Sequence, residues 1–245
     1  MLLLRVRQMG QAHWLALFGL ILAGWAGLFV MAVPPADGYA RALIDSLCGT
    51  DGTPAGPLSS IAMWALMSGA MMAPTALPAF VTYDDLGQST KAPFAPLLAG
   101  YLTVWLGFSV LAGLAQVALV RAGLLDALGT SRAPLFSAFL LFMAGLYQFT
   151  PLKEACLSRC RAPLTFFMAH WQSGPWRMGL RLGSDCLGCC WALMALAWVG
   201  GMMNLGFMAL AMIMMVLEKL PRIGQWLTRP LGVVLILWGL AVVII

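Results

Sequence analysis

The sequence has 245 residues, of which 62% are hydrophobic and 9% are charged, whereas about 25% of the residues in an ordinary soluble domain are charged. A soluble protein of this length has too small an interior to bury that much apolar surface, so the composition excludes a soluble globular domain and indicates an integral membrane protein. The net charge of +5 comes from Lys and Arg residues scattered through short loops, and this dispersed pattern argues against a nucleic-acid partner.

Seven apolar runs predict the helices that cross the lipid bilayer, because a span needs about 20 mainly apolar residues. The runs cover about residues 12–33, 58–82, 94–120, 134–150, 183–200, 202–219 and 228–245. Apolar and polar residues do not alternate over any long stretch, so a β-barrel is not expected. The sequence therefore predicts an all-α fold, a polytopic transmembrane helix bundle that forms a single integral membrane domain over residues 1–245.

Proline and charged residues mark the ends of these runs. Arg5 and Arg7 precede the first run as they would in a signal peptide, but the run is long enough to span, so we predict an uncleaved helix. The Pro-Pro pair at 34–35 is expected to end the first run. Pro78, followed by the acidic pair at 84–85, is expected to end the second.

Residues 183–219 are compatible with two topologies. A single helix over this stretch would be about 55 Å long, nearly twice the hydrocarbon thickness, whereas a hairpin turning at Gly200-Gly201 gives two short spans. With the N-terminus inside, the hairpin leaves few basic residues outside, namely Arg41, Arg121 and Arg132. A single helix would place further basic residues on the outer side of the membrane, so the positive-inside rule favours the hairpin. We predict about seven spans, or six if 183–219 is one bent helix, in a bacterial inner membrane.

The longest polar connection, residues 151–182, is predicted to lie on the cytoplasmic side. It contains an apolar and aromatic piece from Leu164 to Trp171, followed by Trp176. Such a piece is typical of an interfacial helix at the headgroup level, with Trp171 and Trp176 as anchors.

Five of the six cysteines fall close together in the sequence and form a candidate metal site. They are Cys156, Cys160, Cys186, Cys189 and Cys190. The C-x3-C spacing places the first two on one face of a helix just past the fourth run, and the other three open the fifth. If these two helix ends enter the same membrane face, three or four thiolates could hold a soft metal, which favours copper(I), with zinc as an alternative.

Nearby charge supports such a site, because cations offset the negative charge of several thiolates. The basic residues closest in sequence are Lys153, Arg159, Arg161 and Arg181. Two alternatives remain open. Cysteine is a common small apolar residue in membrane helices, and disulfides would be favoured if the cluster faced an oxidising compartment. Cys48 stands alone in the first outside loop, and no role is assigned to it.

Methionine residues recur at helical spacing on the second run, where Met63, Met67 and Met71 share one face. Thioethers bind copper(I) without deprotonation, so Met67, Met71 and Met194 are candidate positions in a metal path. Packing is the alternative, because any buried helix face shows the same spacing.

Three stretches together resemble a known family. They are Met71-Met72-Ala73-Pro74 through Pro78, Tyr147 to Lys153 running into Cys156 and Cys160, and Cys186-Leu-Gly-Cys-Cys-Trp-Ala-Leu-Met194. On these stretches the chain is similar to the bacterial predicted metal-binding integral membrane proteins, sometimes labelled copper chaperones. The first stretch departs from that family's Met-Met-x-Pro-Met-Met pattern, since Thr75-Ala76 replace the second methionine pair.

The resemblance and the cysteines lead to one leading hypothesis and two alternatives. The leading hypothesis is a non-enzymatic, metal-binding membrane protein that handles copper(I) in delivery, insertion or homeostasis, with a partner metalloenzyme. The first alternative is an accessory or scaffolding subunit of a larger membrane complex, in which the cysteines pack or bind zinc. The second is a membrane thiol oxidoreductase that uses Cys189 with Cys186 or Cys190.

Overall fold

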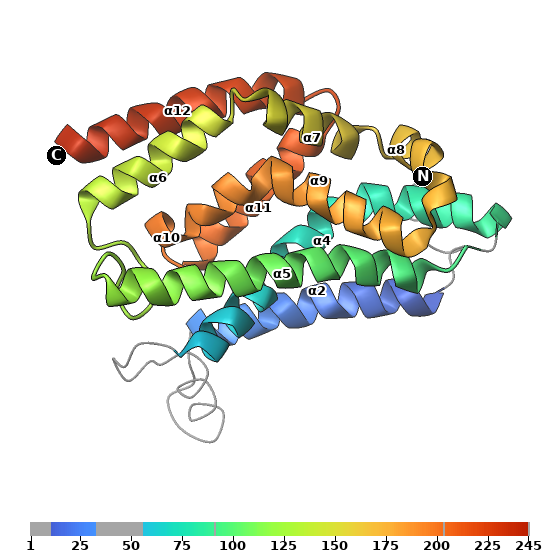
Figure 1. Cartoon of the computed structure of the whole chain (residues 1–245), viewed down its shortest axis with the longest axis horizontal. Helices are drawn as coiled ribbons and strands as arrows, with labels where there is room; N and C mark the ends of the chain where they lie inside the picture. Colours follow the sequence, from blue (N-terminus) through green and yellow to red (C-terminus); the bar gives the residue numbers. More distant parts are fainter. Residues whose placement is uncertain (1–10, 33–55, 91, 203, 245) are drawn as a thin grey trace.

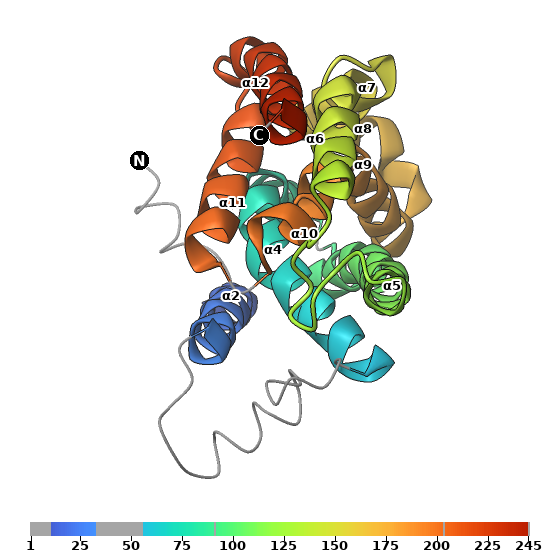
Figure 2. The ribbon, with the colours of Figure 1, turned by 90° about the vertical axis from the view of Figure 1, so that its left-hand side faces the viewer.

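The computed structural model describes residues 11–32, 56–90, 92–202 and 204–244. These residues form helices α2 (Gln11–Ala32), α4 (Pro57–Thr90), α5 (Phe94–Arg121), α6 (Pro134–Tyr147), α7 (Pro151–Arg161), α8 (Pro163–His170), α9 (Pro175–Ala195), α10 (Ala197–Gly200), α11 (Leu205–Lys219) and α12 (Gly224–Ile244), with a 3-10 turn, η1 (Trp171–Ser173). No β-strand occurs in these ranges beyond one isolated bridge. The predicted all-α helix bundle is confirmed (Figures 1 and 2). The predictions for Arg5, Arg7, the Pro-Pro pair at 34–35, Arg41 and Cys48 concern residues outside the described ranges.

Every predicted apolar run contains a helix, but the helices differ in length. Four described helical segments are long and apolar enough to cross a membrane: α4, α5, α9 continued by α10, and α12. The pair α6 and α7, bent by 63°, makes a fifth if it is one span. Helix α11 has 15 residues, about 22 Å at 1.5 Å per residue, which is shorter than the roughly 30 Å hydrocarbon core. The count of seven spans therefore stays a prediction.

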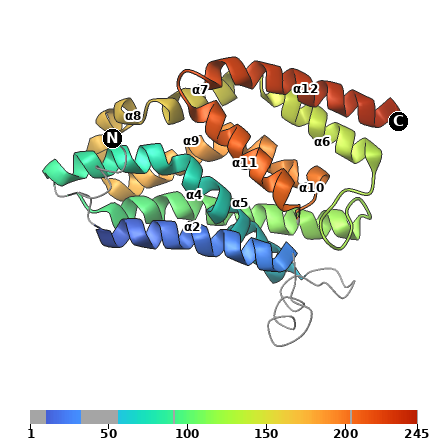
Figure 3. The same ribbon diagram turned by 180° about the vertical axis from the view of Figure 1, so that it is seen from behind.

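The predicted hairpin is confirmed, and the single bent helix over 183–219 is wrong. The helical path breaks after α10 at Gly201, whose φ of +87° is readily adopted only by glycine. The Asn204 side chain then accepts a hydrogen bond from the backbone N–H of Phe207 at 3.0 Å and caps the start of α11. From this turn α11 runs back past α9 (Figures 1 and 3).

Helix α4 continues past Pro78 and Asp84, so the predicted end of the second run is wrong. Pro74 has no N–H to donate to the Ala70 carbonyl, and the indole Nε1 of Trp25 on α2 donates to that oxygen instead, at 3.1 Å. Because the vacated acceptor is satisfied from a neighbouring helix, the prolines bend α4 rather than end it (Figure 3).

Helix α9 begins at Pro175, eight residues before the position expected from the apolar run. Its first turns pack directly against α5, and a Cβ on Gly179 would clash with the Leu97 carbonyl oxygen. Close approach of two backbones through glycine is typical of membrane helix pairs. Arg177 and Arg181 are exposed on the outer face of this segment, and these charges led to the prediction of a polar connection.

The rest of the 151–182 connection is also helical. The predicted piece from Leu164 to Trp171 forms α8 and the start of η1. Its Phe167 is fully buried, and the Trp171 ring packs 5.6 Å from the ring of Tyr83 on α4. Trp176 is 45% exposed. Trp171 therefore anchors this piece to the helix bundle, and its contact with headgroups remains a prediction.

Candidate metal centre

Helices α7 and α9 bring the five clustered cysteines together. Thr150 caps α7 by accepting a hydrogen bond from Lys153 N at 3.3 Å, and Pro151 occupies the first turn, so a new helix starts directly after the bend from α6. Helix α7 carries Cys156 and Cys160, and α9 carries the other three. All five are free thiols, and Cys160 is half-buried while the others are buried.

The α9 cysteines lie in the middle of a helix, not at its end as predicted. Cys186 lies about 16 Å along the helix axis from Pro175 at 1.5 Å per residue, about half the thickness of the hydrocarbon core. The prediction was wrong here because it rested on the late start assigned to this helix. The thiols are therefore enclosed by the bundle.

The sulfur atoms follow one another along the contact between the two helices. The Cys189 thiol lies in the neighbourhood of the thiols of Cys160, Cys186 and Cys190. The Sγ atoms of Cys189 and Cys190 donate to the Cys186 carbonyl oxygen at 3.0 and 2.8 Å. Cys156 packs against Gly188, where an added Cβ would lie 2.6 Å from its Sγ.

The sulfur atoms of these five cysteines do not surround a common point at which a metal ion could bind. Within the described ranges, no three Cys, His, Asp or Glu side chains are grouped so that they could hold a metal ion. Helical hydrogen bonding of two thiols to the Cys186 carbonyl keeps them turned toward the α9 backbone. A metal bound by thiols alone would need new side-chain rotamers, and the assignment of the five cysteines as ligands stays a prediction.

A methionine missed by the sequence reading lies next to the thiols. Met72 on α4 is fully buried, and its Sδ is 3.6 Å from Cys190 Sγ. Two sulfur ligands on metal–sulfur bonds of about 2.3 Å at a tetrahedral angle are about 3.8 Å apart. The available signal was the Met-Met-Ala-Pro stretch, because Pro74 bends α4 where Met72 reaches toward α9.

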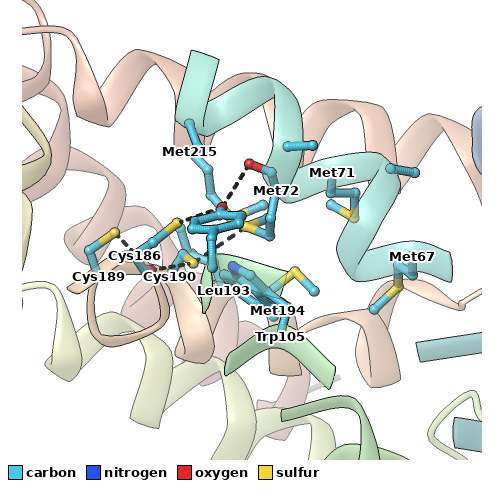
Figure 4. Close-up of a cluster of buried hydrophobic side chains, with 14 of the residues drawn as sticks. Met67, Met71, Met72, Trp105, Cys186, Cys189, Cys190, Leu193, Met194 and Met215 are labelled. Carbon is cyan, nitrogen blue, oxygen red and sulfur yellow. Dashed lines mark hydrogen bonds between the residues drawn. The ribbon is translucent and has the colours of Figure 1, made fainter. Parts of the chain in front are cut away.

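The three methionines assigned to a metal path are all buried in the same core. Met67, Met71 and Met194 are 1–3% exposed. Figure 4 shows the α9 thiols at one end, Met67 at the other, and Met72, Met194 and Met71 between them. This arrangement is compatible with both a sulfur-lined path and simple packing.

One buried cation contacts this cluster, and the sequence reading did not assign it. Lys219, at the end of α11, is 9% exposed, and its Nζ donates to Thr75 Oγ1 at 2.7 Å and to Cys186 Sγ at 3.0 Å. The Tyr101 hydroxyl lies 3.3 Å from the same Sγ and donates to the Met72 carbonyl oxygen at 3.0 Å. An ammonium, a thiol and two hydroxyls therefore meet beside the Met72–Cys190 contact.

The basic residues expected to offset thiolate charge are paired with carboxylates or exposed. Lys153 Nζ lies 2.8 Å from Glu218, and Arg159 lies 2.8 Å from Asp185. Arg161 pairs with a carboxylate as well, and Arg181 is exposed. The cation that contacts a thiol of the cluster directly is Lys219.

A small cavity of about 60 Å³ adjoins the cluster. Its polar and sulfur-bearing lining residues are Thr75, Tyr101, Cys160, Cys186 and Lys219. This volume admits a water molecule or a bare metal ion, so the cavity gives the cluster room for a small cargo and for side-chain movement.

Comparison with known proteins identifies the family. A family model described as PpoB2, copper chaperone, matches residues 61–242, a range that contains all five clustered cysteines, Met72 and Lys219. No curated protein and no solved structure matches the chain. On the length of the family match, the chain belongs to the PpoB2 copper chaperone family, and its role is related to copper.

Proposed function

We propose that this protein binds copper(I) inside the membrane at a mixed thiol and thioether site and passes it to a partner metalloenzyme. The observation that carries this proposal is the 3.6 Å contact between Cys190 Sγ and Met72 Sδ in the interior of the bundle. Copper(I) is soft and binds both kinds of sulfur, whereas zinc sites in proteins rarely use thioethers.

Cys186, Cys190 and Met72 form the core of the proposed site. The two thiols belong to successive turns of the same face of α9, and the thioether reaches them from α4. Rotation of Cys190 Sγ away from the Cys186 carbonyl would let both thiols and the thioether face the adjoining space. We propose that this rotation, without movement of the backbone, is enough for three-coordinate binding by the two helices.

The remaining sulfur residues provide routes toward and away from this core. Cys189 and Cys160 connect the core to α7, and Cys156 continues the series beside Gly188. On the other side, Met194, Met71 and Met67 continue along the core. A chaperone must release its cargo, and transfer between neighbouring sulfur ligands allows this without leaving the ion in lipid. No catalysed reaction is needed, so we propose that the protein is not an enzyme.

The contact between Cys190 and Met72 can be tested by removing the thioether. Leucine has a similar volume but no ligand atom, so Met72→Leu should preserve the fold at a cost below about 1.5 kcal/mol. We expect the wild-type protein, purified in detergent under reducing conditions, to bind about one copper(I) per chain. We expect Met72→Leu to weaken that binding at least about tenfold, measured by competition with a chelator.

The matched control is Met178→Leu, which replaces a methionine equally buried at the start of α9. This variant should bind copper as the wild type does. Equal affinities for Met72→Leu and wild type would exclude Met72 as a ligand. A wild-type protein that binds no copper while keeping all its thiols reactive would contradict the proposed function. Trapping of a mixed disulfide with a partner would favour a thiol oxidoreductase instead.

A further inference from the structure

We infer that Lys219 makes the sulfur site selective for a monovalent over a divalent metal ion, an inference that rests on the proposed function. Lys219 Nζ lies 3.0 Å from Cys186 Sγ, so its charge belongs to the immediate surroundings of any ion held by that sulfur. The side chain is held from its other side by Thr75 Oγ1 at 2.7 Å.

The Lys219 ammonium has no carboxylate partner among the ion pairs of the described residues. Its sequence neighbour Glu218 points instead to Lys153, whose Nζ lies 3.0 and 2.8 Å from the two carboxylate oxygens. The other acidic residue near the thiols, Asp185, pairs with Arg159. A buried ammonium without a counter-charge is costly, and the sulfur atom that Lys219 Nζ contacts, at 3.0 Å, is Cys186 Sγ.

Charge counting in the metal-bound state gives the selectivity. Cysteine ligands bind a metal as thiolates, so two cysteine ligands contribute two negative charges and Lys219 contributes one positive charge. A monovalent ion brings this buried group to neutrality, whereas a divalent ion leaves one uncompensated positive charge. Without the ammonium the balance reverses, and the divalent ion becomes the one that gives a neutral site.

The geometry makes this effect large. A unit charge about 5 Å from the metal, at an effective dielectric constant of about 20, changes the relative affinity for monovalent and divalent ions on the order of 100-fold. Exposed charges are screened by water and have much smaller effects. Lys219 is 9% exposed, so little of its effect is lost to screening. Met72 adds no charge, and neither does the Tyr101 hydroxyl, so neither alters this count.

The test compares dissociation constants for copper(I) and zinc(II), each measured by chelator competition on full-length protein in detergent. We expect Lys219→Met to shift the ratio of the two constants toward zinc on the order of 100-fold. Lys219→Gln keeps a hydrogen-bond donor for Thr75, and it should shift the ratio by a similar factor. Lys219→Arg keeps the positive charge and should leave the ratio within a few-fold of the wild type.

The control variant is Arg159→Gln, which removes a cation near the cysteines that is 59% exposed and paired with Asp185. It should leave the ratio unchanged. The folding of Lys219→Met and Lys219→Gln is checked by their elution in size-exclusion chromatography. If Lys219→Met does not fold, Lys219→Gln alone is the test of the inference. A ratio within threefold of wild type in a folded neutral variant that still binds copper overturns the inference while leaving the proposed function intact. A wild-type protein that binds neither ion overturns both.

Discussion

Replacing both Cys186 and Cys190 with serine should abolish copper(I) binding. Serine is nearly the same size, but its hydroxyl is a hard oxygen ligand that copper(I) does not favour. Loss of hydrogen bonds outside a metal's ligand shell already costs about 10–100-fold in affinity, so loss of two ligands should cost more than about 100-fold. The copper content of purified protein after exhaustive dialysis, measured by elemental mass spectrometry, should fall from about one per chain to background.

The fold of this double variant should persist, because a serine hydroxyl is nearly the size of the thiol it replaces and can also donate a hydrogen bond. Cys190 Sγ donates to the Cys186 carbonyl within α9, and a serine hydroxyl can make the same bond. The control is Cys48→Ser, which removes the isolated cysteine of the sequence and should retain full copper content. Copper at the wild-type level in the folded double variant would show that these two thiols are not the ligands.

Glu218→Gln should destabilise the protein by about 3–5 kcal/mol, because it leaves the Lys153 ammonium buried without its counter-charge. The side chains of this pair are 1% and 2% exposed, and they join α7 to α11. The Glu218 backbone carbonyl also accepts a hydrogen bond from Arg161 Nε at 2.9 Å, and the substitution leaves this backbone acceptor in place. The measurement is the thermal unfolding of the detergent-solubilised protein, monitored by size-exclusion chromatography.

The double variant Lys153→Met with Glu218→Gln tests whether the cost arises from charge. Removing both charges leaves no unpaired buried ion, so it should recover much of the lost stability. A single variant as stable as the wild type, or a double variant no more stable than the single, would contradict this account. Because α7 carries Cys156 and Cys160, the single variant should also expose these thiols to alkylation.

Helix boundaries were predictable where a proline or a charged residue in the sequence marks the end of the helix. The predicted span 94–120 agrees with α5 to within a residue because Pro93 precedes it and a basic residue ends it. The hairpin at Gly200-Gly201 was predictable because charge distribution and glycine content both indicate a break. The end of α4 and the start of α9 were not predictable, since they depend on a distant indole and on a glycine contact with another helix.

The candidate site was likewise predictable only in part. The spacing of the cysteines predicted that α7 and α9 share a thiol-bearing contact, because the i, i+3 and i, i+4 positions of a helix lie on one face. Met72 lies 118 residues from Cys190 in the sequence, and Lys219 lies 33 residues from Cys186. Their proximity follows from the way the bent α4 and the returning α11 pack against α9, and this packing between distant helices is not specified by a local pattern.

The most direct test of the central claim is X-ray absorption at the copper K edge of the copper-loaded wild-type protein. The proposed site predicts a copper(I) edge and a first shell of about three sulfur atoms at about 2.3 Å. Loading Met72→Leu in parallel should remove one of these sulfur atoms. A first shell made of nitrogen or oxygen atoms, or a shell unchanged by the loss of Met72 and of both Cys186 and Cys190, would contradict a copper site at the contact between α4 and α9.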